Sequence, residues 1–344
     1  MLLTGYAGYV SPLQHGGLWG MFPLAFPLAL LSATIMLVLD ILFYRKALFV
    51  VVIGMICGLG PILTYFPMNI FSPTAPADCM RLKLLTYNVC NLQGQNGDTI
   101  SPNPMLEYVM EQDADVVCLQ EAVPLVPNRG LGVTSEQIEQ LHKKYPYIII
   151  GGCGSQAILS KYKTDVIHLD VNKNTFGGGD LAAFRLTLPN GRLIAVFNVH
   201  LFSFALNRED RELYRNLTDL KKEDLHEVKN QLWDKLDAAS VGRAREVQQM
   251  MRWLRQYGGP DVILCGDFND VADCYAIRTL ADTGFKSVYP EIGFGPMITY
   301  NSNRFYFCID HVLYRGCFKP LSINKGRLKA SDHYPLTVEF AVLQ

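Results

Sequence analysis

Charge is nearly absent from the first part of this sequence. No Asp, Glu, Lys or Arg occurs before position 40, and the first eighty residues contain only Asp40, Arg45, Lys46 and Asp78. Two apolar stretches, at about 18–39 and 47–66, reach the roughly 20 residues that a helix needs to span a bilayer. Because uncharged stretches of this length are rare in soluble cores, we expect residues 1–66 to form a membrane anchor with two transmembrane helices rather than a buried helical hairpin.

The N-terminus also lacks the basic residues of a secretory signal peptide, and a second apolar stretch follows the first directly, so a cleaved signal fits poorly. Arg45 and Lys46 lie in the short turn between the two spans, and positive residues in short loops stay on the cytoplasmic side. We therefore expect a multi-pass protein of the cytoplasmic (inner) membrane whose catalytic part lies on the outer face. Arg81 and Lys83, just after the second span, favour the opposite orientation.

A basic excess is missing from the rest of the chain. Residues 67–80 are rich in proline and in small or polar side chains, which is typical of a linker. Residues 81–344 contain 29 basic and 30 acidic side chains, which are the totals of 31 and 32 less two of each sign in the first eighty residues. Proteins that hold long nucleic acid tightly usually carry a basic excess or stripe, so charge disfavours a nucleic-acid partner without excluding one.

The nine cysteines include no CxxC pair and no spacing typical of a zinc site. Cys118 and Cys265 stand inside apolar runs, where cysteine usually behaves as a small buried hydrophobic residue. We expect most of the nine to be free thiols. Free thiols suit a reducing compartment better than the outer face of a membrane.

Short apolar runs separated by turns fill residues 81–344 and predict the fold of this part. The candidate strands include RLKLLTYNV, DADVVCLQE, YPYIIIGG, SQAILSKY, DVILCGDFND, FYFCIDHVLYR and SDHYPLTVEF, and residues 104–112 form a candidate helix. Asn190-Gly191 between two further apolar runs is a strong signal for a β-hairpin. We predict an α/β (α+β) catalytic domain over 81–344, in which two β-sheets pack together with helices outside.

A charged segment between His200 and Asp261 has apolar residues at helical spacing. One set is Leu225, Val228, Leu232 and Leu236, and the other is Ala244, Val247, Met251 and Leu254. We interpret this segment as two amphipathic helices that cover a face of a sheet. The alternative is a lid over the site or a membrane-contacting surface, from which Arg243 and Arg245 would reach a phosphate.

Polar residues that can hold a metal or move a proton recur where buried strands end. They are Asn88, Glu121, His200, Asp267, Asn269, Asp310, Asp332 and His333. Each alone has an ordinary explanation, such as a turn or a helix cap, but the joint pattern is harder to explain that way. Carboxylate and amide oxygens suit Mg²⁺ or Mn²⁺. Histidines without cysteine partners suit proton transfer or phosphate polarisation better than a structural zinc site.

Short motifs at these positions resemble those of a known superfamily. TYNV, LQE, NVHL, GDFN, IDHV and SDHYP, in this order, resemble the motif series of the endonuclease/exonuclease/phosphatase superfamily, and they span nearly all of residues 84–337. That superfamily includes pancreatic-type deoxyribonuclease, abasic-site endonucleases, neutral sphingomyelinases and inositol-polyphosphate 5-phosphatases. The resemblance implies a four-layer α/β/β/α sandwich of two mixed β-sheets. The leading apolar hairpin resembles that of bacterial membrane-anchored members.

The resemblance also implies a metal site. Glu121 would bind Mg²⁺ or Mn²⁺ directly, and Asn88 and Asp332 would complete the site, partly through water. Cys90 stands where abasic-site endonucleases carry an acid, so a second metal ligand is not expected there.

Catalytic roles follow from the same resemblance. Asp267 and Asn269 would position and activate the attacking water and hold the phosphate. His333 would bind and polarise the phosphate, with Asp310 orienting its ring, and His200 would stabilise the pentacoordinate phosphorane or protonate the leaving oxygen. Asp267 and the histidines are alternatives for the group that takes the proton of the water.

The sequence departs from parts of the superfamily. Abasic-site enzymes have tyrosine in the position of the histidine of NVHL, so the chain resembles the deoxyribonuclease and sphingomyelinase branches more closely. No acidic partner for His200 is evident from the sequence, and we interpret His311 as a packing residue.

The sequence therefore predicts a membrane-anchored, divalent-metal-dependent phosphoesterase. Its substrate would be a phosphodiester or phosphomonoester, either a lipid head group or a small phosphorylated metabolite. The alternative is a membrane-tethered, Mg²⁺-dependent endonuclease or exonuclease. A catalytically inactive membrane-bound binding module is less favoured, because every catalytic motif contains a workable residue.

Overall fold

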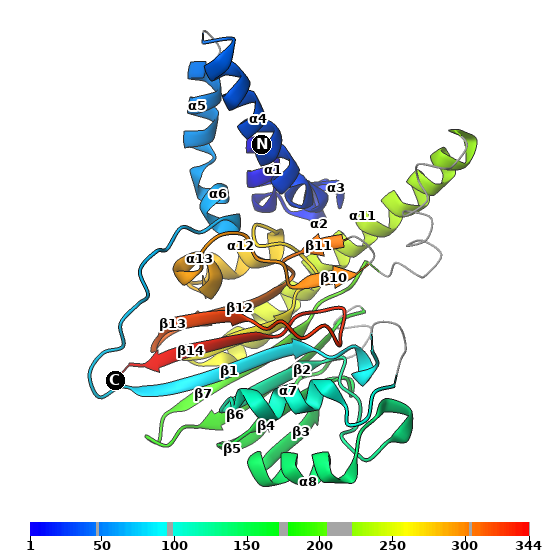
Figure 1. Ribbon diagram of the computed structural model, residues 1–344, viewed down its shortest axis with the longest axis vertical. Helices are drawn as coiled ribbons and strands as arrows, with labels where there is room; N and C mark the ends of the chain where they lie inside the picture. The colour runs from blue at the N-terminus through cyan, green and yellow to red at the C-terminus, as the bar shows by residue number, and fades with distance from the viewer. Residues whose placement is uncertain (46–47, 95–98, 172–177, 205–221, 303–304, 344) are drawn as a thin grey trace.

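Two six-stranded β-sheets form the centre of the molecule (Figure 1). The computed structural model describes residues 1–45, 48–94, 99–171, 178–204, 222–302 and 305–343, without the side chains of 222–232 and 305. The first sheet has the order β13 (Phe318–Lys325), β14 (Leu336–Val342), β1 (Met80–Asn88), β2 (Val116–Gln120), β4 (Gln156–Ser160), β3 (Tyr147–Gly151). The second has the order β5 (Lys163–Ile167), β6 (Asp180–Thr187), β7 (Leu193–His200), β8 (Val262–Asp267), β12 (Asp310–Arg315), β9 (Lys286–Ser287).

Both sheets are mixed. In the first, β1 and β2 run parallel, and in the second β7 and β8 do so, whereas the other neighbouring strands are antiparallel. A short hairpin of β10 (Tyr300–Ser302) and β11 (Phe305–Phe307) stands apart from the two sheets. The carboxyl ends of the two parallel pairs lie at the same edge of the sandwich, since Asn88 at the end of β1 donates a hydrogen bond to Asp267 at the end of β8.

Helices cover the outer faces of both sheets (Figure 1). Over the first sheet lie α7 (Pro104–Gln112) and α8 (Ser135–Lys144); over the second lie α11 (Lys222–Trp253), its π-helical end η5 (Leu254–Gly258) and α12 (Tyr275–Ala281). The shorter elements are η3 (Cys90–Leu92), η4 (Arg129–Leu131) and α13 (Val288–Ile292). Three apolar cores, one between the sheets and one beneath each helical layer, make this the predicted four-layer α/β/β/α sandwich.

The sequence of β2 shows why this strand is buried on both faces. Val116 and Cys118 contribute to the core between the sheets, whereas Val117 and Leu119 contribute to the core under α7 and α8. Side chains alternate between the faces of a strand, so a strand covered on both faces needs a continuous apolar run. The run VVCL meets that requirement.

Two local predictions have clear outcomes in the structure. The β-hairpin is confirmed, since β6 and β7 pair antiparallel and Gly191 occupies the turn with a φ of 81°. The charged segment forms one long helix, α11, within the described residues, and not the two helices that we expected. The apolar residues at 225–236 and 244–254 therefore lie along one continuous helix.

The N-terminal part forms a helical hairpin that projects from the α11 and α12 side of the sandwich (Figure 1). Its elements are α1 (Leu2–Tyr6), η1 (Ala7–Tyr9), α2 (Pro12–His15), α3 (Leu18–Met21), η2 (Phe22–Ala25), α4 (Phe26–Leu42), α5 (Leu48–Cys57) and α6 (Leu59–Tyr65). The segment Leu18–Leu42 is long and apolar enough to cross a membrane. The second expected span is not one straight helix, because α5 and α6 meet at an angle of 64°. It counts as a span only if this bent pair crosses as one unit.

Glycines allow the first 21 residues to pack closely against the catalytic part. A Cβ atom at Gly8 would lie 1.9 Å from the carbonyl oxygen of Asp273, and one at Gly20 would lie 1.6 Å from Oγ of Ser240 on α11. Next to Gly8, the ring of Tyr9 lies 4.6 Å from the guanidinium carbon of Arg278 on α12. The start of the chain is therefore docked on the helical layer of the second sheet.

We expect Gly8→Val to disrupt this docking, because the added side chain overlaps the backbone at Asp273. Overpacking of this kind costs about 1–3 kcal/mol, so the melting temperature of the full-length protein in detergent should fall. Gly54→Val is the matched control, since a Cβ atom there has no neighbour within 4 Å. Equal melting temperatures of the two variants would contradict the docked arrangement.

Candidate active site

The predicted site residues meet at the edge where the parallel strands end. Asn88 ends β1, Glu121 directly follows β2, His200 ends β7 and Asp267 ends β8. The first two belong to one sheet and the last two to the other. The site therefore lies across the seam between the two sheets.

The side chain of Asn88 connects two carboxylates, one from each sheet. Its amide nitrogen donates hydrogen bonds to Oε1 of Glu121 at 3.0 Å and to Oδ2 of Asp267 at 3.1 Å. Its oxygen accepts a hydrogen bond from the backbone N–H of Cys90 at 3.0 Å. In this orientation the nitrogen of Asn88 faces the site, so Asn88 orients the two carboxylates and would reach a metal ion only through water.

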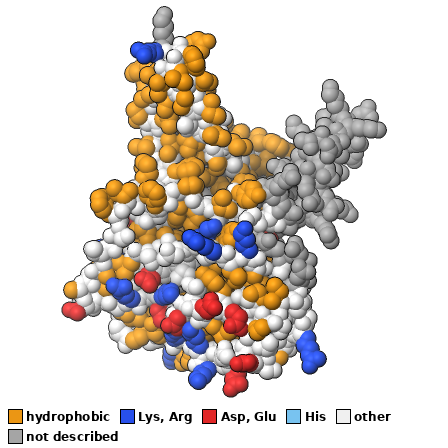
Figure 2. Space-filling model, in the orientation of Figure 1, with side chains coloured by type: hydrophobic (Ala, Val, Ile, Leu, Met, Phe, Trp, Pro, Cys, Tyr) orange, Lys and Arg blue, Asp and Glu red, His pale blue; other side chains and the backbone are white. Residues whose placement is uncertain are grey.

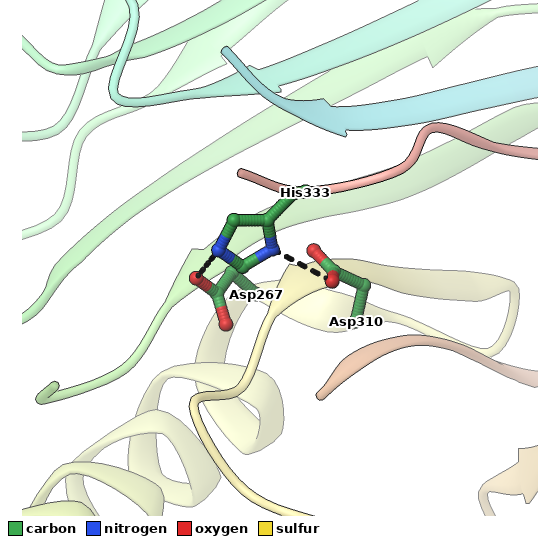
Figure 3. A group of neighbouring side chains, drawn as sticks. All are labelled: Asp267, Asp310 and His333. Atoms are coloured by element: carbon green, nitrogen blue, oxygen red, sulfur yellow. Dashed lines mark hydrogen bonds and ion pairs between the residues drawn. The ribbon is translucent and has the colours of Figure 1, made fainter. Parts of the chain in front are cut away.

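Two histidines face the same carboxylates. Nε2 of His200 lies 3.8 Å from Glu121 and 3.7 Å from Asp267. Nε2 of His333 lies 3.5 Å from Oδ2 of Asp267, while Nδ1 of His333 is 2.8 Å from Oδ2 of Asp310 (Figure 3). The carboxylates that face His200, for which the sequence shows no acidic partner, are thus Glu121 and Asp267.

The charges around His333 outweigh its burial. Burial alone lowers the pKa of this imidazole, but the carboxylates of Asp310, Asp267 and Asp332 together raise its pKa to about 10. Because Asp310 holds Nδ1, the ring is fixed with Nε2 directed at Asp267. A positively charged ring in this position is suited to contact a phosphate oxygen.

The remaining two predicted residues lie beside this group. The backbone N–H of Asn269 donates to Oδ1 of Asp267 at 2.8 Å, and its side-chain nitrogen donates to the carbonyl oxygen of Leu201 at 2.9 Å. Asp332 precedes His333, and its Oδ1 lies 3.3 Å from Oγ of Ser331. Asn269 thus fixes the orientation of Asp267, and Asp332 adds negative charge next to His333.

Backbone strain supports the positions of two of these residues. Glu121 has a φ of 47° and Asn269 a φ of 50°, both in the left-handed region. This conformation costs more at Glu121 than at Asn269, because asparagine tolerates the left-handed region better than most residues. Where it persists, surrounding structure enforces it, commonly at functional sites.

The oxygen atoms at the site fit a hard divalent cation. The carboxylates of Glu121 and Asp267 both contact one amide nitrogen, and no Lys or Arg within the described ranges pairs with either of them. Two carboxylates in such proximity repel each other, and Mg²⁺ binds through one or two carboxylates while keeping several waters. The side chain of Glu121 is 32% exposed and that of Asp267 only 2%, so Glu121 is the carboxylate that a hydrated ion can reach.

A second group of donor atoms is less suited to a metal. The ligand atoms of Asp267, Asp310 and His333 lie within 4.8 Å of one another (Figure 3). However, Nδ1 of His333 already binds Asp310, and Nε2 faces Asp267. This arrangement is that of an oriented imidazole rather than of a metal ligand set.

Several buried polar residues support the site without having been predicted. Nε2 of Gln120 donates to Oδ1 of Asn198 at 2.6 Å and to Thr86 at 3.0 Å, which links the two sheets below the site. Oγ of Ser331 donates to the backbone oxygen of Asn88 at 2.8 Å and accepts from the backbone N–H of His333 at 3.2 Å. Gln120, Asn198 and Ser331 stand inside the motifs LQE, NVHL and SDHYP, so position within a motif was the available signal.

Helix α11 holds the chain on both sides of the site. Glu246 accepts hydrogen bonds from the backbone N–H of Phe202 at 2.6 Å and of Gly179 at 2.8 Å. Burial raises the pKa of Glu246 to about 7, and these hydrogen bonds offset part of that effect. Arg243 donates to Asp270 at 2.9 Å and to the carbonyl oxygen of Phe202 at 3.2 Å. The helix thus fixes the segments that follow His200 and Asn269.

The two arginines of the lid hypothesis differ in position. Arg243 is 2% exposed and paired, whereas Arg245 is exposed. The environments of Arg243 and Arg245 agree with the interpretation that this part of α11 covers a face of the second sheet. His311 is also a packing residue here: its Nε2 lies 2.8 Å from the carbonyl oxygen of Asp270, and burial lowers its pKa.

Comparisons with known proteins identify the family of this arrangement. Residues 85–333 match the model of the Endonuclease/Exonuclease/phosphatase family. An endonuclease/exonuclease/phosphatase from Beutenbergia cavernae is 14% identical over 76% of this chain and 72% of its own, with a TM-score of 0.50. One from Bacteroides vulgatus is 14% identical over 76% of this chain and 99% of its own, also with a TM-score of 0.50. No curated protein matched the sequence.

We expect Arg243→Ala to destabilise the protein, because it leaves the buried carboxylate of Asp270 without its ion-pair partner. Breaking a buried pair from one side costs about 3–5 kcal/mol, which should lower the melting temperature by about 5 °C or more. Arg245→Ala removes an exposed charge two residues further along the same helix and should change the melting temperature little. If both variants melt like the wild type, Arg243 has no structural role of this kind.

Proposed function

The chain belongs to the Endonuclease/Exonuclease/phosphatase family, and on that premise we propose that it is a membrane-bound phosphoesterase that depends on a divalent metal ion and two histidines. As a member of this family it is an enzyme that hydrolyses phosphate ester bonds. The proposal goes further in assigning Mg²⁺ or Mn²⁺, a phosphodiester or phosphomonoester substrate, and attachment to a lipid bilayer.

One observation carries this proposal. Glu121 and Asp267, from two different sheets, both contact the amide nitrogen of Asn88, and Nε2 of His200 lies within 4 Å of each carboxylate. Negative oxygens and imidazoles in one small volume supply both a metal site and contacts to a phosphate. Phosphoryl transfer needs mainly positioning and charge neutralisation, and no covalent nucleophile is required.

We assign the metal site to Glu121, with Asp332 and Asn88 contributing through water. A bound Mg²⁺ or Mn²⁺ would neutralise phosphate charge and favour ionisation of water. Asn88 orients Glu121 by its amide nitrogen, and Ser331 fixes both the backbone of Asn88 and the start of the His333 segment. These contacts hold the donor atoms in place before substrate arrives.

We assign the attacking water to Asp267. Its Oδ2 faces both histidines and Asn88, and its Oδ1 is fixed by the backbone N–H of Asn269. A carboxylate held in this way can orient a water molecule and accept its proton. It is the one carboxylate in the group that faces both imidazoles.

The histidines act on the phosphate in this scheme. His333, held by Asp310, contacts a non-bridging oxygen and stabilises the charge that develops on it. His200 stabilises the pentacoordinate phosphorane or donates a proton to the leaving oxygen. His200 ends β7 and His333 lies in the segment before β14, so the two rings approach Asp267 from different parts of the chain.

Two features favour a lipid head group or a small phosphorylated metabolite as the substrate. The catalytic domain has no basic excess, with 29 basic and 30 acidic residues in 81–344, which disfavours tight binding of long nucleic acid. The docked hairpin also holds this domain next to a segment that is long and apolar enough to cross a membrane. A membrane-tethered nuclease is the outcome that a substrate comparison would reveal instead.

We expect hydrolysis of bis-p-nitrophenyl phosphate, phospholipid or inositol phosphate by the full-length protein to require Mg²⁺ or Mn²⁺ and to stop in EDTA. Glu121→Gln and His333→Ala should each lower kcat by at least about a hundredfold, the scale of one lost electrostatic contact in the transition state. Glu111→Gln and His142→Ala, at exposed positions of α7 and α8, are the matched controls.

Full activity in EDTA or in Glu121→Gln would refute the metal assignment. Plasmid DNA belongs in the same panel of substrates. Cleavage of DNA at a higher kcat/KM than any of the small esters or lipids would establish the nuclease in place of the proposed activity.

We further propose that the hairpin enters the cytoplasmic membrane and that the catalytic domain lies on its outer face. Arg45 stands at the tip of the hairpin, and positive residues in short loops stay in the cytoplasm. The exposed thiol of Cys153 in the catalytic domain should therefore react with a membrane-impermeant maleimide in intact spheroplasts. Cys153→Ser is the control for specific labelling. Protection in intact spheroplasts, with labelling only after lysis, would reverse the orientation.

A further inference from the structure

A cavity lies where the membrane hairpin joins the catalytic domain. Its volume is about 200 Å³. Pro27 of α4 and residues 64–66 at the end of α6 form the wall on the hairpin side. The wall on the catalytic side includes Val271, Ala272 and Asp310.

The lining of this cavity favours an apolar occupant. An apolar protein cavity of about 150 Å³ stays dry and binds small hydrocarbons, so this volume is sufficient for part of a hydrocarbon chain. Buried water needs two to four polar partners, and three of the polar side chains in the lining already have partners in the protein. The hydroxyl of Thr64 donates to Gly60, that of Tyr289 donates to Gly295, and the carboxylate of Asp310 binds His333.

The mouth of the cavity lies within an exposed apolar surface. Ile298 and Tyr306, both in the lining, are 37% and 56% exposed. Met68, which follows α6, forms a backbone bridge with Phe294, and both are exposed apolar residues. Hydrophobic side chains continue from the projecting hairpin onto the adjoining surface of the body (Figure 2). Exposed apolar surface of this kind marks a binding site or a membrane contact.

We propose that this cavity binds a hydrocarbon chain of a bilayer lipid. The wall on the hairpin side indicates a lipid as the ligand, because Pro27 belongs to the segment that is long and apolar enough to cross a membrane. A cavity beside the base of such a segment opens where acyl chains are present at high concentration. The inference rests on the proposed membrane insertion of the hairpin, but not on the proposed phosphoesterase chemistry.

The cavity and the active site share one residue. Asp310 begins β12, lines the cavity, and holds Nδ1 of His333. A lipid chain in the cavity would pack against the strand end that orients this imidazole. Asp310 would thus contact the lipid chain on one side and hold His333, the proposed phosphate ligand, on the other.

The test uses full-length protein in nanodiscs of phosphatidylethanolamine and phosphatidylglycerol. A trace of phosphatidylglycerol carries a photoactivatable diazirine on one acyl chain, and labelled peptides are mapped by mass spectrometry. We expect label on the peptides that contain Val271 and Ala272 or residues 289–298, in addition to α4 and α5. This readout needs no hydrolysis, so it is independent of the enzyme assays.

Two variants block the cavity in different ways. Ala272→Phe fills the space and should reduce label at the cavity at least about fivefold through steric exclusion. Its control is Ala281→Phe, which adds the same side chain at an exposed position of α12. Circular dichroism shows whether Ala272→Phe folds.

Ile298→Asp places a charge at a residue of the lining that is 37% exposed, and should lower the label at least about fivefold through the cost of desolvating the carboxylate. Circular dichroism shows whether this variant folds as well. Its control is Leu193→Asp, 56% exposed at the opposite end of β7 from His200. This variant decides the question if Ala272→Phe is unfolded.

Label confined to the hairpin in the wild type, or label at the cavity unchanged in folded Ala272→Phe and in Ile298→Asp, would overturn the lipid site. Flotation of the protein with vesicles of the same lipids is measured in parallel. Failure to float would refute membrane insertion and the lipid site together, whereas flotation without cavity label would refute the lipid site alone. Neither result depends on the metal-dependent hydrolysis measured above.

Discussion

The two hydrogen bonds from the side chain of Asn88 hold the proposed active site together. One goes to Glu121 on its own sheet and the other goes to Asp267 on the facing sheet. Asp267 is buried and held by Asn269, whereas the more exposed Glu121 could turn toward solvent, and the shared donor at the seam brings both carboxylates to the same point. The cost of burying Asn88 is offset because its nitrogen and its oxygen both have partners. The way in which the two sheets pack therefore sets the distances between the residues of the site.

The same logic extends outward to α11. Around Ser240 this helix contacts the docked N-terminal segment, and one to two turns later Arg243 and Glu246 bind the backbone of Phe202. Because both segments pack on one helix, α11 fixes the docked N-terminal segment and the segment after His200 relative to each other.

The sequence predicted those elements of the sandwich that depend on interactions between residues close together in the chain. The strand pattern of β1 and β2, the turn at Gly191 and the helix α7 follow from periodicity and turn chemistry, and the motifs indicated which strand ends would meet. Contacts between distant residues were beyond that reasoning. Glu121 and Asp267 could not be identified as the carboxylates facing His200, because that proximity depends on how one sheet lies on the other. The direction of the Asn88 amide likewise depends on Cys90, which the sequence offered only as a departure from a motif.

The N-terminal region shows a further limit and its consequence. The lack of charge in the N-terminal region predicted transmembrane helices. It gave no sign that the first 21 residues pack on the catalytic domain, where Gly8 and Gly20 permit the close approach. If residues 67–80 were the only connection between the hairpin and the catalytic domain, this flexible chain of 14 residues would allow their separation to vary over about 20 Å. Docking removes this freedom and fixes the seam of the sandwich relative to the hairpin. With the hairpin inserted in a bilayer as we propose, this docking would hold the site at a defined height above the membrane, which is a geometric constraint on the substrates.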